Sequence, residues 1–293
     1  MAILRKINAN LHLYMALPAI ALFGLFFIYP LAQGIGISLT DSNGVTAPNF
    51  VGLRNFADFF QDDRARTDVT NTVLFALGSA PLLNLFGLLY ALLLDRKMAG
   101  RGFARAAVYL PAVISPLIMG YIWYFILQPG RGYLSHALGE LGLGFLDGNW
   151  LGESSSALVV LIVVNVWQYV GMTMIVYLAG LQNIPADLYE AGAIDGAGRL
   201  ASLRYITLPL LYPAIKINVV TNIIGSLSVF EIIVALTDGG PGYATESLSI
   251  YIMRMLYGSF TGYSTAVALI LFAIIIVPVL VFLRLTRKSE YEL

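Results

Sequence analysis

The chain has 293 residues, of which 58% are apolar and only 12% are charged, and its mean hydropathy is +0.79. Soluble domains carry roughly 25% charged residues, so this chain lacks the charge to cover a surface that faces water. Its 17 basic and 17 acidic residues cancel, which leaves no basic excess for binding nucleic acid. The absence of cysteine excludes disulfides, iron–sulfur ligation and a cysteine nucleophile. The composition indicates a polytopic membrane protein.

Apolar runs bounded by charge predict an all-α membrane protein with six transmembrane helices. A helix needs about 20 mostly apolar residues to cross a bilayer. The runs cover approximately 13–31, 72–94, 106–127, 157–180, 214–235 and 265–283. Proline inside several runs is compatible with this prediction, because neighbouring helices re-satisfy the freed backbone groups. The alternative for the first run is a cleaved signal peptide, but the run exceeds the roughly 7–15 residues of a signal core.

The distribution of Lys and Arg predicts that both termini are cytoplasmic. Cytoplasmic loops carry an excess of these residues, and an N-terminus placed inside puts 12 of the 17 on that side. The inner set is Arg5, Lys6, Arg96, Lys97, Arg101, Arg105, Arg199, Arg204, Lys216, Arg284, Arg287 and Lys288. The outer set is Arg54, Arg64, Arg66, Arg131 and Arg254.

No short repeat or low-complexity tract divides the chain, so we expect one integral domain over 1–293 with a core of 70–285. The outer loops are expected at 41–68, 128–155 and 238–264. The last of them mixes apolar and polar residues over Glu246–Tyr257, which predicts a helix lying along the membrane surface.

The cytoplasmic loop over 181–210 carries the strongest functional signal. Asn183 is a candidate helix cap, and Asp195-Gly196 is expected to end the first short helix because Gly adopts backbone angles that other residues avoid. A second short helix over about Leu200–Ile206 is expected to end before Pro209. This pattern predicts either a compact knob that another protein grips or a plain connector at the lipid interface.

The residues of this loop also resemble a known motif. The EAA loop of permease subunits in bacterial binding-protein-dependent ABC importers reads Glu-Ala-Ala, three residues, Gly, nine residues, then Ile-x-Leu-Pro. Every spacing holds in this chain, which has Glu190-Ala191-Gly192, Gly196 and Ile206-x-Leu208-Pro209. Gly192 in place of the second Ala is the one departure, and it makes the first short helix slightly less stable.

Further segments resemble the carbohydrate-uptake branch of that family, and they occur in the family's order. They are Tyr29-Pro30 with Ser38, Phe50-Val-Gly-Leu-x-Asn55-Phe56, Leu110-Pro111 with Trp123, and Thr237-x-Gly239-Gly240-Pro241 with Thr245. Each is weak alone, since a Gly-Gly-Pro run is usually just a turn.

The resemblance implies the architecture of a type I ABC importer permease and a set of partners. These are nucleotide-binding ATPase subunits, a second permease subunit that is commonly a paralogue, an extracytoplasmic solute-binding protein and a sugar; no cofactor or metal is implied. The positions expected to couple to the ATPase are Glu190, Ala191, Gly192, Asp195, Gly196, Leu208 and Pro209. The chain has no Gly-Lys pair and hence no phosphate-binding Gly-x-x-x-x-Gly-Lys-Ser/Thr loop, so ATP hydrolysis is assigned to a partner.

Polar side chains inside the spans are candidates for the solute path, since burying them unpaired is costly. Asn165 and Tyr169 are four residues apart and share a helix face, as do Asn222 and Ser226. Positions matching the family's sugar pocket favour this set. A second stripe on another face of the fifth span consists of Thr221, Ser228 and Glu231. One stripe is expected to face the solute and the other the partner subunit; alternatively, these groups merely join helix to helix.

Glu231 is the only acid inside a span and is a further candidate for solute binding. A carboxylate there argues against an anionic solute such as glycerol-3-phosphate, because like charges repel in a low-dielectric cavity. The alternative is that Glu231 pairs with a group such as Arg254 near the outer interface.

Two other functional classes fit the sequence less well. A membrane enzyme needs a nucleophile, a metal cage or an acid–base pair, but the two histidines, His12 and His136, lie apart and the intramembrane acid has no carboxylate partner. An ion-coupled secondary transporter usually places more ionisable residues at mid-membrane. Co-purification with an ATPase would separate an ABC permease from both.

Overall fold

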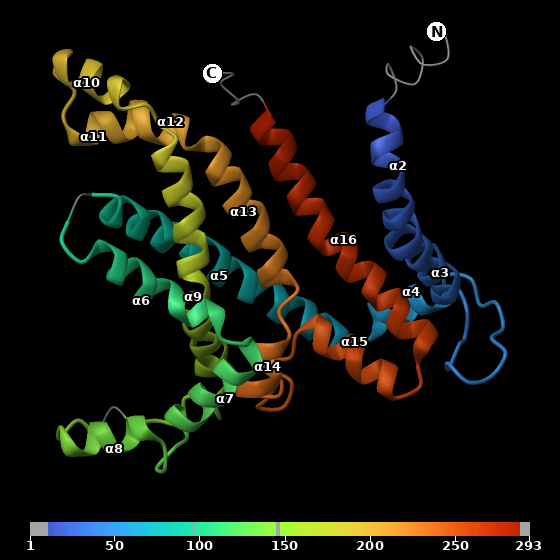
Figure 1. Ribbon diagram of the computed structural model, residues 1–293. Helices are drawn as coiled ribbons and strands as arrows, with labels where there is room; N and C mark the ends of the chain where they lie inside the picture. Colours follow the sequence, from blue (N-terminus) through green and yellow to red (C-terminus); the bar gives the residue numbers. More distant parts are fainter. Residues whose placement is uncertain (1–10, 97, 145–146, 288–293) are drawn as a thin grey trace, which may run out of the picture. The chain divides into compact units, whose positions relative to one another are not determined.

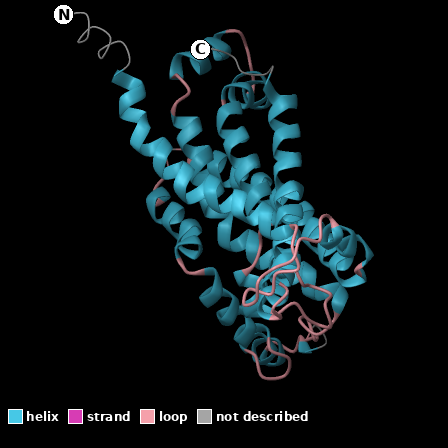
Figure 2. Cartoon of the chain, turned by 90° about the vertical axis from the view of Figure 1, so that its right-hand side faces the viewer, coloured by secondary structure: helices cyan, strands magenta, loops and turns pink. Residues whose placement is uncertain are grey.

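The computed structural model describes residues 11–96, 98–144 and 147–287. The chain divides into two compact units, one of 1–62 with 252–270 and one of 63–251 with 271–293. Helices are the repeating structure throughout the described ranges, as Figure 2 shows. The only extended pairing in these ranges is an isolated antiparallel bridge between Thr40 and Phe50. Four of the basic residues used to predict the orientation lie outside the described residues: Arg5, Lys6, Lys97 and Lys288.

The first unit begins with a helical rod made of α2 (Leu11–Phe23), the π-helical turn η1 (Gly24–Ile28) and α3 (Tyr29–Ser38). The loop after it is closed by α4 (Arg54–Gln61), where Asn55 donates hydrogen bonds to the carbonyls of Ser38 and Thr40, both at 2.8 Å. The backbone and side chain of Asn49 donate to the carboxylate of Asp41, and these bonds hold the pKa of Asp41 below its usual value.

The second unit holds most of the helices, which Figure 1 shows in sequence colours. They are α5 (Asp63–Leu94), α6 (Arg101–Val113), α7 (Pro116–Leu127), α8 (Tyr133–Glu140), α9 (Ser154–Gln182), α10 (Ala186–Ile194), α11 (Arg199–Ser202), η3 (Leu203–Thr207), α12 (Leu208–Leu210), α13 (Tyr212–Leu227) and α14 (Glu231–Leu236). The residues of α15 (Leu248–Tyr257) and α16 (Thr261–Thr286) are shared between the two units.

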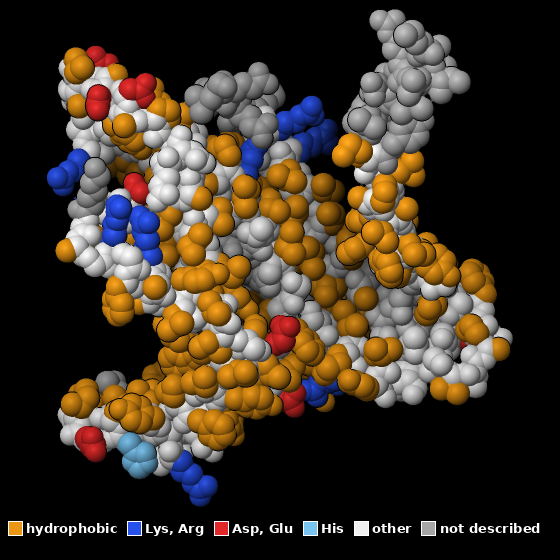
Figure 3. Space-filling view, viewed as in Figure 1, with side chains coloured by type: hydrophobic (Ala, Val, Ile, Leu, Met, Phe, Trp, Pro, Cys, Tyr) orange, Lys and Arg blue, Asp and Glu red, His pale blue; other side chains and the backbone are white. Residues whose placement is uncertain are grey.

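The apolar helices allow up to six spans, as predicted, but the bent pair that would make the fifth is Arg199–Leu210 with Tyr212–Leu227 and not 214–235. Four are long enough to cross a bilayer, and six spans result if each of two bent pairs counts as one. The predicted runs over 72–94, 157–180 and 265–283 lie within α5, α9 and α16, and the first run lies within the rod of the first unit. The helix predicted over Glu246–Tyr257 is confirmed as α15, which begins at Leu248; its place along the membrane surface stays a prediction. Hydrophobic side chains cover much of the face drawn in Figure 3.

Two predicted spans are not single helices. The run over 106–127 bends by 97° between α6 and α7, because Pro116 disfavours a helical backbone at Ser115. There the buried Gln168 amide of α9 donates to the freed Ile114 carbonyl at 3.1 Å. The run over 214–235 is interrupted between Leu227 and Glu231, so it comprises α13 and the separate short helix α14.

The prediction that a helix ends before Pro209 is wrong. The backbone continues helically from Arg199 to Leu210 and then turns by 68° into α13. Proline has no N–H with which to bond the carbonyl four residues back. Directly before Pro209 the helix forms a π-turn, in which the Leu208 N–H bonds the Leu203 carbonyl. The same arrangement precedes Pro30, where Tyr29 N–H bonds the Gly24 carbonyl. Widening the helix by one residue lets the backbone pass each proline without breaking.

The predicted outer loops are also shorter than expected. Residues 54–61 form α4 and α5 begins at Asp63, so the loop over 41–68 contains two helical segments. The loop over 128–155 contains α8. Asn183 is not the cap of α10 as expected; the residue at that position is Pro185.

The core of the second unit lies where α5, α9 and α13 pack together. Its buried residues include Ala91, Met174, Tyr177 and Leu211. On another side of α9 the backbone of α6 comes so close that a Cβ on Gly171 would meet the Val108 carbonyl. Glycine is therefore required there for close packing, and α9 becomes the central helix that positions its neighbours.

Candidate functional site

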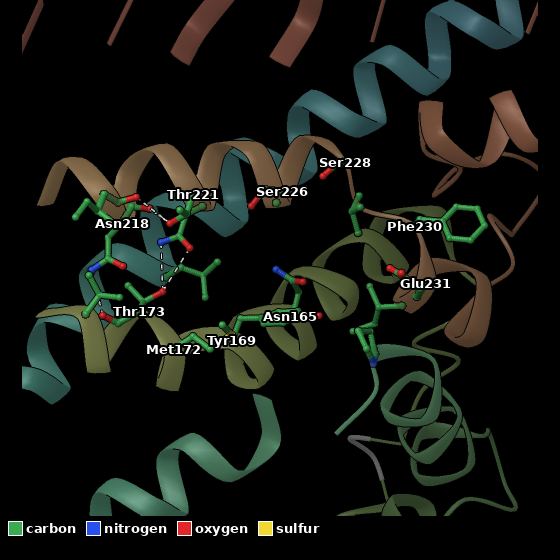
Figure 4. Close-up of a pocket in the computed structure, with 18 residues that line it drawn as sticks. Asn165, Tyr169, Met172, Thr173, Asn218, Thr221, Ser226, Ser228, Phe230 and Glu231 are labelled. Carbon is green, nitrogen blue, oxygen red and sulfur yellow. Dashed lines mark hydrogen bonds between the residues drawn. The ribbon is translucent and has the colours of Figure 1, made fainter. Parts of the chain in front are cut away.

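A cavity of about 510 Å³ opens between α9, α13 and the start of α14 (Figure 4). All 18 of its lining residues belong to the second unit. Its walls carry amides, hydroxyls and one carboxylate among apolar side chains. Uncharged hydrogen-bonding groups of this kind bind polar, neutral molecules, and the apolar remainder suits the carbon faces of such a molecule.

Asn165 and Tyr169 reach this cavity from α9, as their spacing predicted. Asn165 is only 6% exposed, so its amide is held within the cavity wall. One turn further along α9, Thr173 exchanges hydrogen bonds with Asn222 of α13 at 3.3–3.4 Å. Polar side chains of α9 and α13 therefore face each other, and the Thr173–Asn222 contact also joins the two helices.

Asn218, Asn222 and Ser226 follow one face of α13 at intervals of four residues, and all three line the cavity. Asn218 donates to the Thr173 carbonyl at 3.1 Å. The Ser226 hydroxyl is buried and has no hydrogen-bond partner among the described residues. It is therefore an unsatisfied polar group inside the cavity wall, where leaving a hydroxyl unpaired is costly.

The second polar stripe lines the same cavity as the first, and which stripe faces the solute and which the partner subunit stays a prediction. Thr221, Ser228 and Glu231 belong to the lining together with Asn222 and Ser226. The cause is the interruption after Leu227, which redirects the chain so that α14 meets α9 and α7. Glu231 stands in the first turn of α14, where an acidic side chain complements the helix dipole.

Sequence reasoning missed two residues that shape the cavity most directly, Thr173 and Asn218. Each lies four residues from a residue that was selected, Tyr169 and Asn222 respectively. Extending the same-face rule by one turn would have found both. Met172 and Phe230 also line the cavity, but their apolar side chains carried no signal.

The 181–210 loop forms the expected knob of short helices. Gly196 follows α10 with φ of +81°, and the loop closes as a Schellman motif. Ala197 N–H bonds the Gly192 carbonyl at 2.8 Å, and Gly196 N–H bonds the Ala193 carbonyl at 3.1 Å. Gly196 is thus required by its left-handed backbone, and Asp195 is the C-cap residue that precedes it.

The two arms of the knob are packed against each other. The Tyr189 hydroxyl lies 3.1 Å from that of Thr207. A Cβ on Gly192 would stand 2.8 Å from the Ile206 Cδ1 atom. Gly192 stands where the family pattern has Ala, and the missing methyl group leaves room for the Ile206 side chain.

The outer surface of the knob is exposed and apolar. Ile194 is 86% exposed and Leu200 is 79% exposed, while Glu190, Ala191, Asp195 and Gly196 are also exposed. Leu208 and Pro209 are half-buried at the point where the loop leads back toward α13. Exposed apolar side chains of this kind mark a surface that contacts either another protein or the membrane, which are the two expectations for this loop.

The knob and the cavity are joined through the same two helices. In Figure 1, α10 and α11 lie at the end of α9 remote from α7 and α14. The 181–210 loop begins at the end of α9 and leads into α13, and these two helices supply most of the cavity lining. From Tyr169 to the end of α9 is a distance of about 20 Å at the rise of an α-helix. Among the described residues, no group of three or more His, Cys, Asp or Glu could hold a metal ion.

These features define a multi-pass helical membrane protein with an internal polar pocket and an exposed knob of short helices. The family model described as "Binding-protein-dependent transport system inner membrane component" matches residues 83–290. The chain belongs to this family, and it is a multi-pass protein of the inner membrane.

Curated relatives match nearly the full chain. It is 34% identical over 267 residues to the probable starch degradation products transport system permease protein AmyD of Thermoanaerobacterium thermosulfurigenes, covering 91% of this chain and 90% of that one. It is also 34% identical to the trehalose/maltose transport system permease protein MalF of Thermococcus litoralis, covering 96% and 95%.

A solved structure matches the fold over the same extent. A chain in the crystal structure of a bacterial ABC transporter involved in the import of the acidic polysaccharide alginate has a TM-score of 0.83 at 27% identity, covering 99% of this chain and all of that one. A second crystal structure shows a bacterial alginate transporter in complex with its alginate pentasaccharide-bound periplasmic protein.

Proposed function

We propose that this chain forms half of the translocation path of an ATP-driven importer for a sugar or oligosaccharide. The observation that carries the proposal is that the exposed 181–210 loop connects the two helices, α9 and α13, that line the polar cavity. A displacement of the loop is therefore transmitted along both walls of the cavity. Family membership supports a transport role, and the permease relatives named above support a carbohydrate.

The cavity chemistry favours a neutral sugar. Asn165, Asn222 and Ser226 offer amide and hydroxyl groups that exchange hydrogen bonds with sugar hydroxyls. Tyr169 offers a ring face, and Glu231 accepts hydroxyl protons. An anionic solute such as glycerol-3-phosphate, or a polyuronate like the alginate of the structural relative, would meet the Glu231 carboxylate in a low-dielectric site.

ATP binding and hydrolysis are assigned to partner ATPase subunits that grip the knob. Ile194 and Leu200 supply exposed apolar surface, and Glu190 supplies a directional charge. The Schellman closure at Gly196 keeps these groups in a fixed arrangement. A rigid knob moves as one body with the ATPase surface, which is the property that mechanical coupling needs.

We infer that a second permease subunit, a paralogue, completes the cavity. An extracytoplasmic solute-binding protein would deliver the solute to the opposite end from the knob. The structural relative that was solved together with a periplasmic solute-bound protein supports this partner. Both termini and the knob are then on the cytoplasmic side, in agreement with the Lys and Arg distribution.

Reconstitution tests the proposal. The chain, its neighbouring permease and ATPase subunits and the binding protein are placed in liposomes with ATP inside, and uptake of labelled neutral and uronate oligosaccharides is compared. ATP-dependent uptake of a neutral oligosaccharide is expected. Concentrative uptake by this chain alone, without nucleotide, would refute the proposal, and uptake of only the uronate would refute the role of Glu231.

The orientation of the chain in the membrane can be tested by cysteine labelling without background reaction, because the chain has no cysteine of its own. In the chain expressed without its ATPase subunits, a cysteine at Ile194, which is 86% exposed on the knob, should react with a membrane-impermeant maleimide only after the membrane is opened. A cysteine at Tyr133, which is 77% exposed at the start of α8, should react in intact cells stripped of their outer membrane. The reverse pattern would overturn the inside assignment of the knob.

A further inference from the structure

The three tryptophans of the chain belong to α7 and α9 or to the loop between them: Trp123 in α7, Trp150 just before α9, and Trp167 within α9. Trp123 of α7 and Trp167 of α9 pack edge to face, with ring centroids 5.4 Å apart. Trp150, in the loop before α9, lines the same groove as Trp123. The Ser156 hydroxyl donates to the Trp150 carbonyl at 2.8 Å and fixes this loop against the helix. The indoles of Trp123 and Trp150 therefore line one groove, and each is positioned by a contact with α9 or its first turn.

The groove has a volume of about 560 Å³, and none of its described lining residues carries an ionisable side chain. Its lining consists of Trp123, Leu127, Trp150, Ser155, Ser156, Val159, Val160, Val163 and Val164. The only side-chain polar groups in this set apart from the indoles are two serine hydroxyls at one end, and that of Ser156 is already bonded. Water needs two to four polar partners to occupy a site, so the valine-lined part of the groove suits a hydrocarbon and not water.

The groove lies on the side of α9 that faces away from the polar cavity. Val163 and Asn165 are two positions apart, which is about 200° around an α-helix. Trp167 and Tyr169 have the same relation. Val159 is 57% exposed and Val163 is 58% exposed, so the described part of the chain leaves this face open. If the cavity faces the second permease, as the proposed function states, the groove faces the bilayer.

We propose that the groove binds one acyl chain of a membrane phospholipid, held between the indoles of Trp123 and Trp150. The bilayer surrounds a multi-pass inner membrane protein, so lipid is the solvent of every span face that no subunit covers. Tryptophan is enriched where spans meet the membrane interface, and the groove sits at the beginning of α9 with its serine hydroxyls at the end nearest the loop. The acyl chain fills an apolar depression that would otherwise be void, and it buttresses α7, the helix on which α14 packs.

Photo-crosslinking in the complete transporter tests this inference. A benzoylphenylalanine is placed at Val163, and in a matched control at Val281, which is 51% exposed on α16 outside the groove. The transporter is reconstituted with phosphatidylethanolamine, extracted in detergent, washed free of bulk lipid and irradiated. Mass spectrometry of the chain then identifies the adduct.

A phospholipid adduct at Val163 that survives washing, with several-fold less at Val281, is the expected result. Val159→Phe fills the groove from an exposed position and should lower the adduct at Val163 several-fold while α9 stays folded. A polypeptide adduct at Val163 would show that a partner subunit covers the groove and would overturn the inference. Equal lipid adducts at both positions, or none at Val163, would overturn it as well. The adduct is measured without ATP or solute, so the lipid test gives a valid result even if the proposed import function is wrong.

Discussion

Arg64 and Glu246, which are 182 residues apart in the sequence, form a two-pronged ion pair. The guanidinium Nε and Nη2 atoms lie 2.8 and 2.9 Å from the two carboxylate oxygens, and the Glu246 side chain is fully buried. The Arg64 Cζ atom also lies 3.7 Å from the ring centroid of Tyr243. The pair ties the first turn of α5 to the segment between α14 and α15.

Arg64→Ala should destabilise the purified protein by about 3–5 kcal/mol, because it leaves the buried Glu246 carboxylate without its partner. Thermal unfolding in detergent measures the effect. Arg54→Ala is the matched control: its pair with Asp58 is largely exposed, with side chains 75% and 53% accessible. We expect less than about 1 kcal/mol there. Equal losses in the two variants would contradict the importance of burial.

The double variant Arg64→Met with Glu246→Met separates the charge from the packing. Replacing a buried ion pair with apolar residues of similar volume is often close to neutral, so the double variant should recover most of the stability lost by Arg64→Ala. A double variant as unstable as the single one would mean that the stacking on Tyr243, and not the buried charge, is what matters.

Gly196→Val should abolish uptake while leaving membrane insertion intact. Gly196 has φ of +81°, and a left-handed backbone costs a residue with a side chain roughly 1–2 kcal/mol. Losing the Schellman closure would displace Glu190 and Ile194 on the knob. Asn tolerates this conformation, so Gly196→Asn should keep much of the uptake. Gly198→Ala is the control two residues away, with φ of −70° and open space around its Cβ position; a defect equal to that of Gly196→Val would reject the backbone explanation.

Asn165→Ala combined with Asn222→Ala should reduce uptake of a neutral oligosaccharide by about tenfold or more, if each lost hydrogen bond is worth roughly 1 kcal/mol in the transport cycle. Uptake in proteoliposomes measures this, with ATP hydrolysis recorded in parallel. Gln33→Ala, which removes an exposed amide from α3, is the control and should leave uptake unchanged. We would withdraw the pocket assignment if the double variant transported its solute at the normal rate and with the normal selectivity.

Gly171→Ala and Gly102→Ala should have effects of opposite sign. The first adds a methyl group against the Val108 carbonyl and the Tyr109 Cα atom, which are backbone and cannot move aside cheaply. We expect a loss of about 1–3 kcal/mol from this overpacking. Gly102 stands in the first turn of α6 with open space around it, so alanine there should add up to about 1 kcal/mol through helix propensity. Comparable destabilisation by both would show that α6 and α9 are not in close backbone contact.

Much of the candidate site could be predicted from local spacing. Residues four apart on a helix share a face whatever surrounds them, which is why Asn165 with Tyr169 and Asn222 with Ser226 were selected correctly as cavity-lining pairs. The left-handed turn at Gly196 was predictable for a similar reason, since glycine and the flanking helix signals act within a few residues. Their roles in solute binding and ATPase coupling stay predictions.

The positions of the helix breaks were not predictable in this way. A run of apolar residues such as 106–127 satisfies the length for one crossing, and hydropathy does not record the direction of the backbone. The 97° turn at Ser115 is stable because Gln168, from a distant part of the sequence, bonds the carbonyl that the break exposes. The interruption after Leu227 likewise depends on α14 packing against α7.

The sequence by itself determined that this protein is a helical membrane protein with a loop of short helices closed by a glycine turn, because hydropathy and glycine-dependent turns are local properties. Only the tertiary structure decided that two polar stripes share one cavity, that Arg64 reaches Glu246, and that Trp123 and Trp150 line one groove. Each of these relations joins helices whose mutual distance is set by side-chain packing, and packing depends on residues far apart along the chain.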